Sequence, residues 1–149
     1  MIKIKNISQE NLFDVCELTS NANGIATVFE DYICCNATSI AEARYFPNFH
    51  PKSLYFENTL IGFFMYKTSP DNLKNVMICR YMLDHKFIGK GLGRKSFKAI
   101  LDFLRSEGIQ EITLGLDEKN KIAENLYKSF NFKFTGNIIN DEHIYYLTL

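Results

Sequence analysis

The sequence predicts a single mixed α/β domain, in which a central sheet of about six or seven strands is flanked by about four helices. Three observations lead to this prediction. The chain has 149 residues, which is enough for one domain with its own hydrophobic core. Strand-like and helix-like periodicities alternate along it. No linker, internal repeat or low-complexity segment interrupts them, so we treat residues 1–149 as one domain.

The chain opens with the pattern of one strand and one helix. Residues 2–5 alternate apolar and lysine residues, as a half-buried strand does. Leu12, Val15 and Cys16 then mark one face of a helix. Residues 20–36 contain a glycine and several asparagines, and we interpret them as an irregular connection.

A second helix and a hairpin follow. Ser39 and Glu42 have the spacing of a capping box, which predicts that a short helix opens at Ser39. The apolar runs 54–56 and 60–66 flank residues 57–59, and this arrangement is typical of a β-hairpin.

The middle of the chain predicts a buried strand before a long helix. Residues 69–72, Ser-Pro-Asp-Asn, form a turn. Residues 76–83 are nearly all apolar, as expected for a central strand buried on both faces. Apolar residues recur at helical spacing over 97–104, and Gly108 marks the end of that helix.

The last third predicts a strand, a helix and two short strands. Residues 112–116 alternate as a strand does. A helix stripe follows, formed by Ile122, Ala123, Leu126, Tyr127 and Phe130. The two remaining strands lie around 132–134 and 144–149.

Composition and charge exclude several classes of protein. Hydrophobic residues make up 46% of the chain and charged residues 23%, which is ordinary for a globular domain. The formal net charge is zero, which argues against a nucleic-acid binder. No apolar run is long enough to span a membrane, and the first residues lack the apolar core of a signal peptide. We therefore expect a cytoplasmic protein with neither nucleic acid nor membrane as partner.

The cysteines and histidines show no metal-binding pattern. Cys16, Cys34, Cys35 and Cys79 match no zinc spacing, and the three histidines are scattered. We expect free, mostly buried thiols and no metal site.

The segment FIGKGLGRKS, residues 87–96, is a basic, glycine-rich turn at the head of a predicted helix. An arginine breaks the Gly-Lys-Ser order of a Walker loop, and the alternation G-x-G-x-G does not match a dinucleotide fingerprint. Glycines let backbone N–H groups converge, and the helix adds its positive end. Lys90 and Arg94 add charge. The turn therefore predicts a phosphate site, with a surface turn capped by glycine as the alternative.

The strand, turn and helix together resemble motif A of the GNAT superfamily of N-acetyltransferases. The consensus Gln/Arg-x-x-Gly-x-Gly/Ala falls on Ile88, Gly91 and Gly93, and Ile88 departs from it. The family holds the pyrophosphate of coenzyme A mainly with backbone N–H groups, which a changed side chain leaves in place. The resemblance implies the GNAT fold and acetyl-CoA as co-substrate.

Residues 120–132, NKIAENLYKSFNF, resemble the next motif of the family, Asn-x-x-Ala-x-x-x-Tyr-x-x-x-Gly-Phe. Asn131 replaces the glycine, and asparagine tolerates the left-handed conformation that a helix end often needs. The matching positions are Asn120, Ala123, Tyr127 and Phe132. The resemblance is firm over residues 76–132 and extends to the rest by strand order.

The resemblance implies direct acetyl transfer from acetyl-CoA to an amine. Tyr127 takes the position that protonates the departing thiolate, and the alternative is a half-buried core tyrosine. Lys128 is either a phosphate ligand or a solvated surface lysine. The implied acetyl-CoA-binding residues are Tyr81, Met82, Leu83, Ile88, Gly89, Lys90, Gly91, Leu92, Gly93, Arg94, Asn120, Ala123 and Lys128.

Over its whole length the chain looks like the bacterial spermine/spermidine acetyltransferases of this superfamily, for example in SLYF at 53–56 and IGFFMY at 61–66. Polyamines are cations, so their site should carry carboxylates. These enzymes tend to have an acid where this chain has Cys79. We therefore name as substrate candidates Cys79 and the acids Glu17, Glu30, Asp31 and Glu42, each of which has an ordinary surface charge as its alternative.

Other functions stay open. The acceptor amine could belong to an aminoglycoside or a protein N-terminus. The chain could also be a coenzyme A-binding sensor without catalysis, which Cys79 favours and Tyr127 opposes. An α/β domain with an accidental glycine turn is the third alternative. The partners we expect are a small amine substrate and a second copy of the chain in a homodimer.

Overall fold

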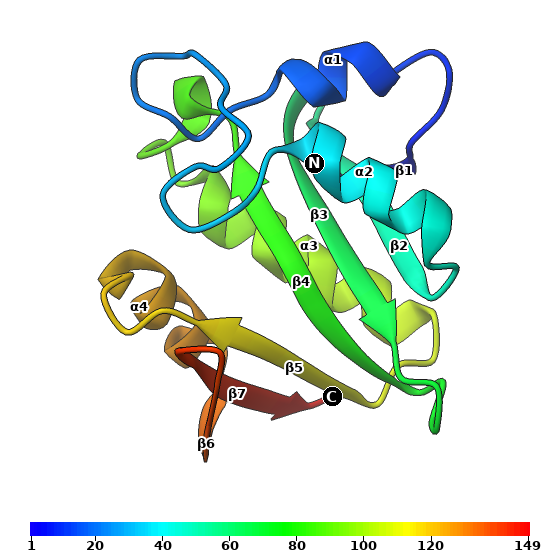
Figure 1. Ribbon diagram of the computed structural model, residues 1–149, viewed down its shortest axis with the longest axis vertical. Coiled ribbons are helices and arrows are strands. Elements are labelled where there is room, and N and C mark those ends of the chain that lie inside the picture. Colours follow the sequence, from blue (N-terminus) through cyan, green and yellow to red (C-terminus); the bar gives the residue numbers. More distant parts are fainter.

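The computed structural model describes residues 1–149 and shows one seven-stranded sheet with four α-helices (Figure 1). The strands are β1 (Ile2–Asn6), β2 (Phe49–Phe56), β3 (Thr59–Thr68), β4 (Asn75–Leu83), β5 (Glu111–Leu116), β6 (Lys133–Ile139) and β7 (Glu142–Thr148). The helices are α1 (Leu12–Glu17), α2 (Asn36–Tyr45), α3 (Leu92–Ser106) and α4 (Lys121–Ser129), and a turn of 3-10 helix, His85–Phe87, follows β4. The predicted fold class and order of elements are confirmed.

The strands lie in the order β1-β2-β3-β4-β5-β7-β6. Only β4 and β5 are parallel neighbours, and α3 forms the crossover that parallel pairing requires. In Figure 1, α1 and α2 cover the front face of the sheet and α3 lies behind it. The sheet therefore has a helix layer on each side, and its centre is the pair β3 and β4.

The core has two parts, one on each face of the sheet. β3 reaches both, because its successive side chains point to opposite faces. The smaller cluster, under α1 and α2, consists of Val15, Leu18, Phe63, Met65 and Met82. The larger cluster packs α3 against the sheet, and four of its buried residues are the predicted helix stripe Phe97, Ile100, Leu101 and Leu104. Burial of each such side chain contributes roughly 1.5–3 kcal/mol.

The structure contradicts the predicted capping box. α2 begins at Asn36, so Ser39 lies inside the helix and is fully buried. The Ser39 hydroxyl donates to the Cys35 carbonyl at 3.3 Å. The Asn36 side-chain amide donates to the Val15 carbonyl of α1 at 2.9 Å, which anchors the start of α2 three residues earlier than predicted. This tertiary contact outweighs the local signal.

Three smaller predictions are also corrected. Ile122 does not belong to the packed stripe of α4; it lies in the first turn, where nothing covers it, and 85% of its surface is exposed. The final hairpin is longer than predicted, because β6 and β7 meet at the turn Asn140–Asp141, where both residues have positive φ. The cysteines are free, but each is partly exposed rather than buried. Two of them, Cys34 and Cys35, lie in the irregular segment 20–36, which contains no regular helix or strand before Asn36. No helix of the chain is long and apolar enough to cross a membrane.

Candidate active site

The parallel strands β4 and β5 separate along their length. Their pairing runs from Asn75 and Glu111 to Ile78 and Leu114 and then stops. From Arg80 onward β4 pairs with β3 only. Figure 1 shows the two strands diverging towards the left of the view. One edge of β4 is therefore free to bond a ligand through its backbone over the last five residues of the strand.

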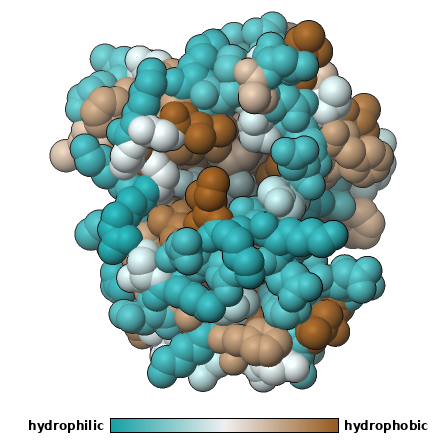
Figure 2. All heavy atoms as spheres, turned by 90° about the vertical axis from the view of Figure 1, so that its left-hand side faces the viewer, coloured by the Kyte–Doolittle hydropathy of each residue, from teal (hydrophilic) through white to brown (hydrophobic).

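The face onto which these strands open is the one shown in Figure 2. Apolar side chains are exposed in the middle of this face, in a hollow between hydrophilic parts of the surface. An apolar hollow with a polar rim is typical of a small-molecule site.

A β-bulge interrupts β4 at Cys79. Tyr66 pairs with Ile78 and Met65 pairs with Arg80, so Cys79 has no partner in β3. A bulge lets two successive side chains leave the strand on the same side. Cys79 packs against the smaller core cluster, and the Arg80 side chain reaches Glu42 of α2, so both lie on the face covered by α1 and α2.

The side chain of Tyr81 fastens the end of β4 to α3. Its hydroxyl donates to the Gly93 carbonyl at 2.9 Å and lies 2.7 Å from the Ser96 hydroxyl. Its ring packs on Phe97 with the centroids 5.4 Å apart. Burial raises the pKa of Tyr81 to about 12. The side chain is thus structural, and the backbone of Tyr81, with those of Met82 and Leu83, forms the open edge.

The glycine turn presents unpaired amides. Gly89 and Gly91 have φ values of 79° and 74°, and Gly91 precedes the first residue of α3. A Cβ added at either glycine would meet nothing within 4 Å. No amide from residue 88 to residue 94 donates a hydrogen bond within the chain, and the Lys95 amide makes none to the Gly91 carbonyl. In α1, α2 and α4, by contrast, the residue before the helix accepts a bond from the fourth helical amide. The start of α3 therefore offers free N–H groups and the positive end of a helix to an anion.

The side chains around this turn have different surroundings. Leu92 is buried in the core, so only its backbone faces the turn. Ile88 and Lys90 are exposed. Arg94 reaches α4 instead, where it donates to the Ser129 hydroxyl at 2.6 Å and lies over the Phe130 ring.

Lys128, on α4, is exposed and bonds Glu124 at 2.7 Å. This hydrogen bond is the main reason why the pKa of Lys128 is raised. The pairing with Glu124 occupies one N–H donor of Lys128. It agrees with the alternative that Lys128 is a solvated surface lysine and not a phosphate ligand.

Tyr127 lies where α3, α4 and the end of β4 meet. Its ring packs on Phe97 and Phe132, with centroids 5.0 and 6.0 Å apart. Burial raises its pKa well above the ordinary value, and the nearby Tyr81 adds to this effect. The Tyr127 hydroxyl makes no hydrogen bond within the chain. It is not sealed in the core, since the only enclosed side-chain atom without a hydrogen-bond partner is His85 Nδ1. A protonated hydroxyl without a protein partner is able to donate to a ligand, whereas the alternative of a core tyrosine bonded to a buried group finds no partner here.

Asn120 and Ala123 begin α4 beside this tyrosine. The Asn120 side-chain oxygen accepts from the Ala123 amide at 3.2 Å and caps the helix. The Asn120 side-chain NH₂ group has no partner in the chain, so it remains available to a ligand. Ala123 packs against the larger core cluster.

The residues on the α2 side of β4 form a mixed-charge cluster. The Arg80 guanidinium lies 3.7 Å from the Glu42 carboxylate, 3.2 Å from the Cys34 sulfur and 2.9 Å from the Cys79 carbonyl. Burial raises the pKa of the Cys79 thiol to about 11, so this thiol is neutral at pH 7 and is not a base. Glu42 is the one predicted acid that the structure brings near Cys79 through Arg80.

The other predicted acids lie elsewhere. Glu17 and Asp31 are exposed to solvent. Glu30 is half-buried and its carboxylate accepts hydrogen bonds from Thr19 and Ser20. These bonds outweigh the effect of burial, which acts to raise the pKa of Glu30, and they hold it below its ordinary value.

Residues 20–132 match the model of the acetyltransferase (GNAT) family. The chain belongs to the GNAT family. Over 143 residues it is 30% identical to the spermine/spermidine N(1)-acetyltransferase of Bacillus subtilis, which covers 92% of this chain and 91% of that protein. The family assignment confirms the resemblance seen in the two motifs.

Solved structures show the same fold. PaiA N-acetyltransferase from Thermoplasma acidophilum, in complex with coenzyme A, has a TM-score of 0.68 at 19% identity, covering 100% of this chain and 99% of that one. A chimera of the spermidine N-acetyltransferase SpeG from Vibrio cholerae has a TM-score of 0.74 at 15% identity, covering 99% and 95% of the two chains.

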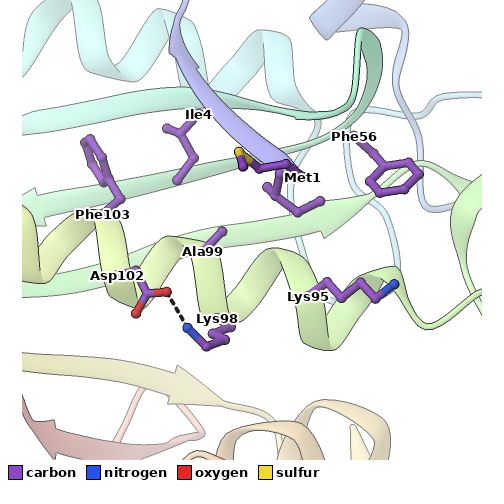
Figure 3. Close-up of a pocket in the computed structure, with 9 residues that line it drawn as sticks. Met1, Ile4, Phe56, Lys95, Lys98, Ala99, Asp102 and Phe103 are labelled. Carbon is purple, nitrogen blue, oxygen red and sulfur yellow. Dashed lines mark hydrogen bonds and ion pairs between the residues drawn. The ribbon is translucent and has the colours of Figure 1, made fainter.

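One cavity of this GNAT chain lies away from the site. It has a volume of about 610 Å³ and lies between β1 and α3, where Figure 3 shows the pair Lys98 and Asp102 at its edge. Of the residues that line it, only Lys95 belongs to the start of α3 described above. No group of three or more His, Cys, Asp or Glu side chains is placed to hold a metal ion.

Sequence reasoning missed two features of the site. The bulge at Cys79 carries no signal in the apolar run 76–83. The role of Arg80 had a signal in the sequence, because a charged residue within an apolar strand requires a partner.

Proposed function

We propose that the protein transfers the acetyl group of acetyl-CoA to a primary amine of a small cationic acceptor, with polyamines such as spermine and spermidine as the substrate class. The observation that carries the transfer chemistry is the combination of the open edge of β4, the free amides of residues 88–94 and the unpartnered Tyr127 hydroxyl. The polyamine acceptor is supported by the 30% identity to the Bacillus subtilis spermine/spermidine enzyme. A cytoplasmic location and a homodimer stay predictions from the sequence.

Acetyl-CoA fits the residues present. An extended pantetheine arm carries amides that match the free backbone edge at Tyr81, Met82 and Leu83. Its pyrophosphate matches the unpaired amides that follow Ile88, where two glycines leave room for close approach. The free NH₂ group of Asn120 is a further donor to the arm.

Tyr127 acts in this proposal as the general acid. The amine attacks the thioester carbonyl, a C–N bond forms and the C–S bond breaks. The acceptor ammonium loses one proton before the attack and a second one as the amide forms. The departing thiolate takes the proton of the Tyr127 hydroxyl, and the Tyr127 phenolate regains a proton from water. Cys79 does not take the proton of the amine, because burial keeps the thiol neutral with a pKa of about 11. Water or another group in the acceptor site fills that role.

Glu42 is the carboxylate that we assign to the acceptor. It lies on α2 opposite the bulge and is held only by the long contact of 3.7 Å to Arg80. An ammonium group of a polyamine would compete with the guanidinium for it. The contact is weak because partly exposed ion pairs are typically worth about 1 kcal/mol or less.

A screen of amines against acetyl-CoA, read by release of the coenzyme A thiol, tests the proposal. We expect turnover with spermidine and spermine. Turnover with a peptide N-terminus or an aminoglycoside alone would overturn the polyamine acceptor and leave acetyl transfer in place. Acetyl-CoA binding by calorimetry without turnover on any amine would indicate a sensor module.

A further inference from the structure

The segment 20–36, which joins α1 to α2, runs along the carboxyl end of β4. Gly24 lies against the His85 side chain, since a Cβ added to Gly24 would come within 2.9 Å of the imidazole. Cys34, near the other end of the segment, lies 3.2 Å from the Arg80 side chain. The segment therefore flanks the strand end that carries the bulge and the open edge.

This segment has no regular structure of its own to hold it in place. It contains one isolated bridge, between Phe29 and Cys34, and its apolar residues are largely exposed. Those exposed residues are Ile25, Val28, Phe29 and Tyr32. An irregular segment with so little buried surface keeps one conformation only if specific bonds fix it.

Glu30 supplies these bonds inside the segment. Its carboxylate accepts from the Thr19 hydroxyl, from the Ser20 amide at 2.9 Å and from the Ser20 hydroxyl at 2.7 Å. Charge-assisted bonds of this kind are roughly twice as strong as bonds between neutral groups. They close the segment into a loop whose two ends lie at Thr19 and Glu30.

Thr19 in turn fixes the loop to the end of β4. Its amide donates to the Asp84 carboxylate at 3.0 Å, and its carbonyl accepts from the His85 amide at 2.7 Å. Thr19 and Asp84 are 1% and 2% exposed, so solvent does not compete for these bonds. Asp84 follows directly on Leu83, the last residue of the open edge.

We propose that Thr19 and Glu30 are positioning residues, which hold segment 20–36 as one wall of the acceptor site, with Asp84 as their anchor on β4. This inference rests on the proposed transfer to a small amine. Glu30, a substrate candidate in the sequence, is thereby assigned to the segment and not to the amine. A polyamine ammonium would have to displace three hydrogen bonds to reach its carboxylate.

We call the hydrogen bonds that join Glu30, Thr19 and Asp84 the tether of segment 20–36. Two substitutions should weaken the tether, and a third should restore it. Thr19→Val removes the hydroxyl at nearly constant volume, and Glu30→Gln removes the charge. We expect the KM for spermidine to rise at least tenfold in both, while the KM for acetyl-CoA stays within about twofold. Thr19→Ser keeps a hydroxyl and should bring the KM for spermidine back to within about threefold of the original. Thr148→Val, at an exposed threonine of β7, is the matched control.

The outcomes separate the possible roles. A rise in KM for Glu30→Gln without one for Thr19→Val would mean that Glu30 binds the amine directly. A lower Tm in both variants with unchanged KM values would mean that the network serves only the fold. Either result overturns the inference.

Hydrogen exchange tests the tether without any substrate. We expect faster exchange of the amides in segment 20–36 in Thr19→Val than in Thr148→Val. Equal exchange rates of these amides in the two variants would overturn the inference that the tether holds the segment. Faster exchange in a protein that acetylates no amine supports the tether while the proposed function fails.

Discussion

The guanidinium of Arg80 lies 3.7 Å from the carboxylate of Glu42, so the acid nearest the bulge of β4 is already paired with a cation. The pair joins the central strand to α2 across the acceptor side of the site. In the proposed function, this geometry would make Arg80 a competitor of the cationic acceptor for the Glu42 carboxylate. The strength of that competition is open to measurement.

We predict that Arg80→Gln lowers the KM for spermidine about threefold or more at low ionic strength. Removal of the guanidinium frees the Glu42 carboxylate, and two charges about 4 Å apart interact by about 1 kcal/mol even in bulk water. The gain should shrink in high salt. Lys133→Gln removes an exposed charge on β6 and should change nothing. A KM that rises in Arg80→Gln would show that the guanidinium supports the acceptor site.

Cys79→Asp should raise kcat/KM for polyamines about tenfold. The substitution places a carboxylate next to Arg80, at a partly buried position where burial favours the protonated form and so moves the acid towards the pKa of a useful base. Cys79→Ala should leave the turnover within about twofold, because the thiol is neutral at the pH of the assay. An unchanged kcat/KM in Cys79→Asp would mean that another group or water removes the proton of the amine.

Tyr127→Phe should lower kcat by roughly 10²- to 10⁴-fold, the usual contribution of a general acid. The affinity for acetyl-CoA should change by less than about tenfold, since one hydrogen bond contributes about 0.5–1.5 kcal/mol. The Tm should stay nearly unchanged, because the hydroxyl has no partner in the chain to lose. Full turnover in the Phe variant would exclude Tyr127 as an essential acid.

Gly91→Ala and Gly108→Ala form a matched pair at the two ends of α3. Both glycines have positive φ, 74° and 82°, and an added Cβ meets nothing within 4 Å at either. Both substitutions should therefore cost about 1–2 kcal/mol of backbone strain. Only Gly91→Ala should also weaken acetyl-CoA binding, by at least tenfold or about 1.4 kcal/mol by calorimetry. Equal affinities in the two variants would remove the glycine turn from the site.

The stability difference between the wild type and Glu30→Gln should depend on pH. Hydrogen bonds from Thr19 and Ser20 overcome the effect of burial and hold the folded pKa of Glu30 below its ordinary value of 4.5. The ionised carboxylate therefore stabilises the fold above pH 4.5, and this contribution is lost as the pH falls through the lower folded pKa. Tm values from pH 7 down to pH 3 should converge for the two proteins. A constant difference would contradict the role of the charge.

Local patterns in the sequence were sufficient for the order of the elements and for the two family motifs. Asn131 illustrates this, because its predicted left-handed conformation is confirmed by a φ of 69°. The prediction of α3 was reliable because only a helix places its apolar positions on one face. These positions are Phe97, Ile100, Leu101 and Leu104.

The features that the sequence did not predict depend on contacts between residues that are distant in the sequence. The start of α2 follows from the bond between Asn36 and Val15, which no pattern around Ser39 contains. The bulge at Cys79 follows from the register between β3 and β4. The role of Glu30 could not be read from the sequence either, because its partners Thr19 and Ser20 come ten or more residues earlier.

The early end of the pairing between β4 and β5 divides the sheet at a seam. Within the sheet, four residue pairs between β4 and β5 join strands β1 to β4 to strands β5, β7 and β6. The glycine turn and segment 20–36 belong to one side of that seam, and Tyr127 follows β5 on the other. A molecule bonded along the free edge of β4 would take the place of the missing neighbour strand. In the proposed function, acetyl-CoA would occupy that place, with the proposed general acid Tyr127 on one side of it and the proposed acceptor wall on the other.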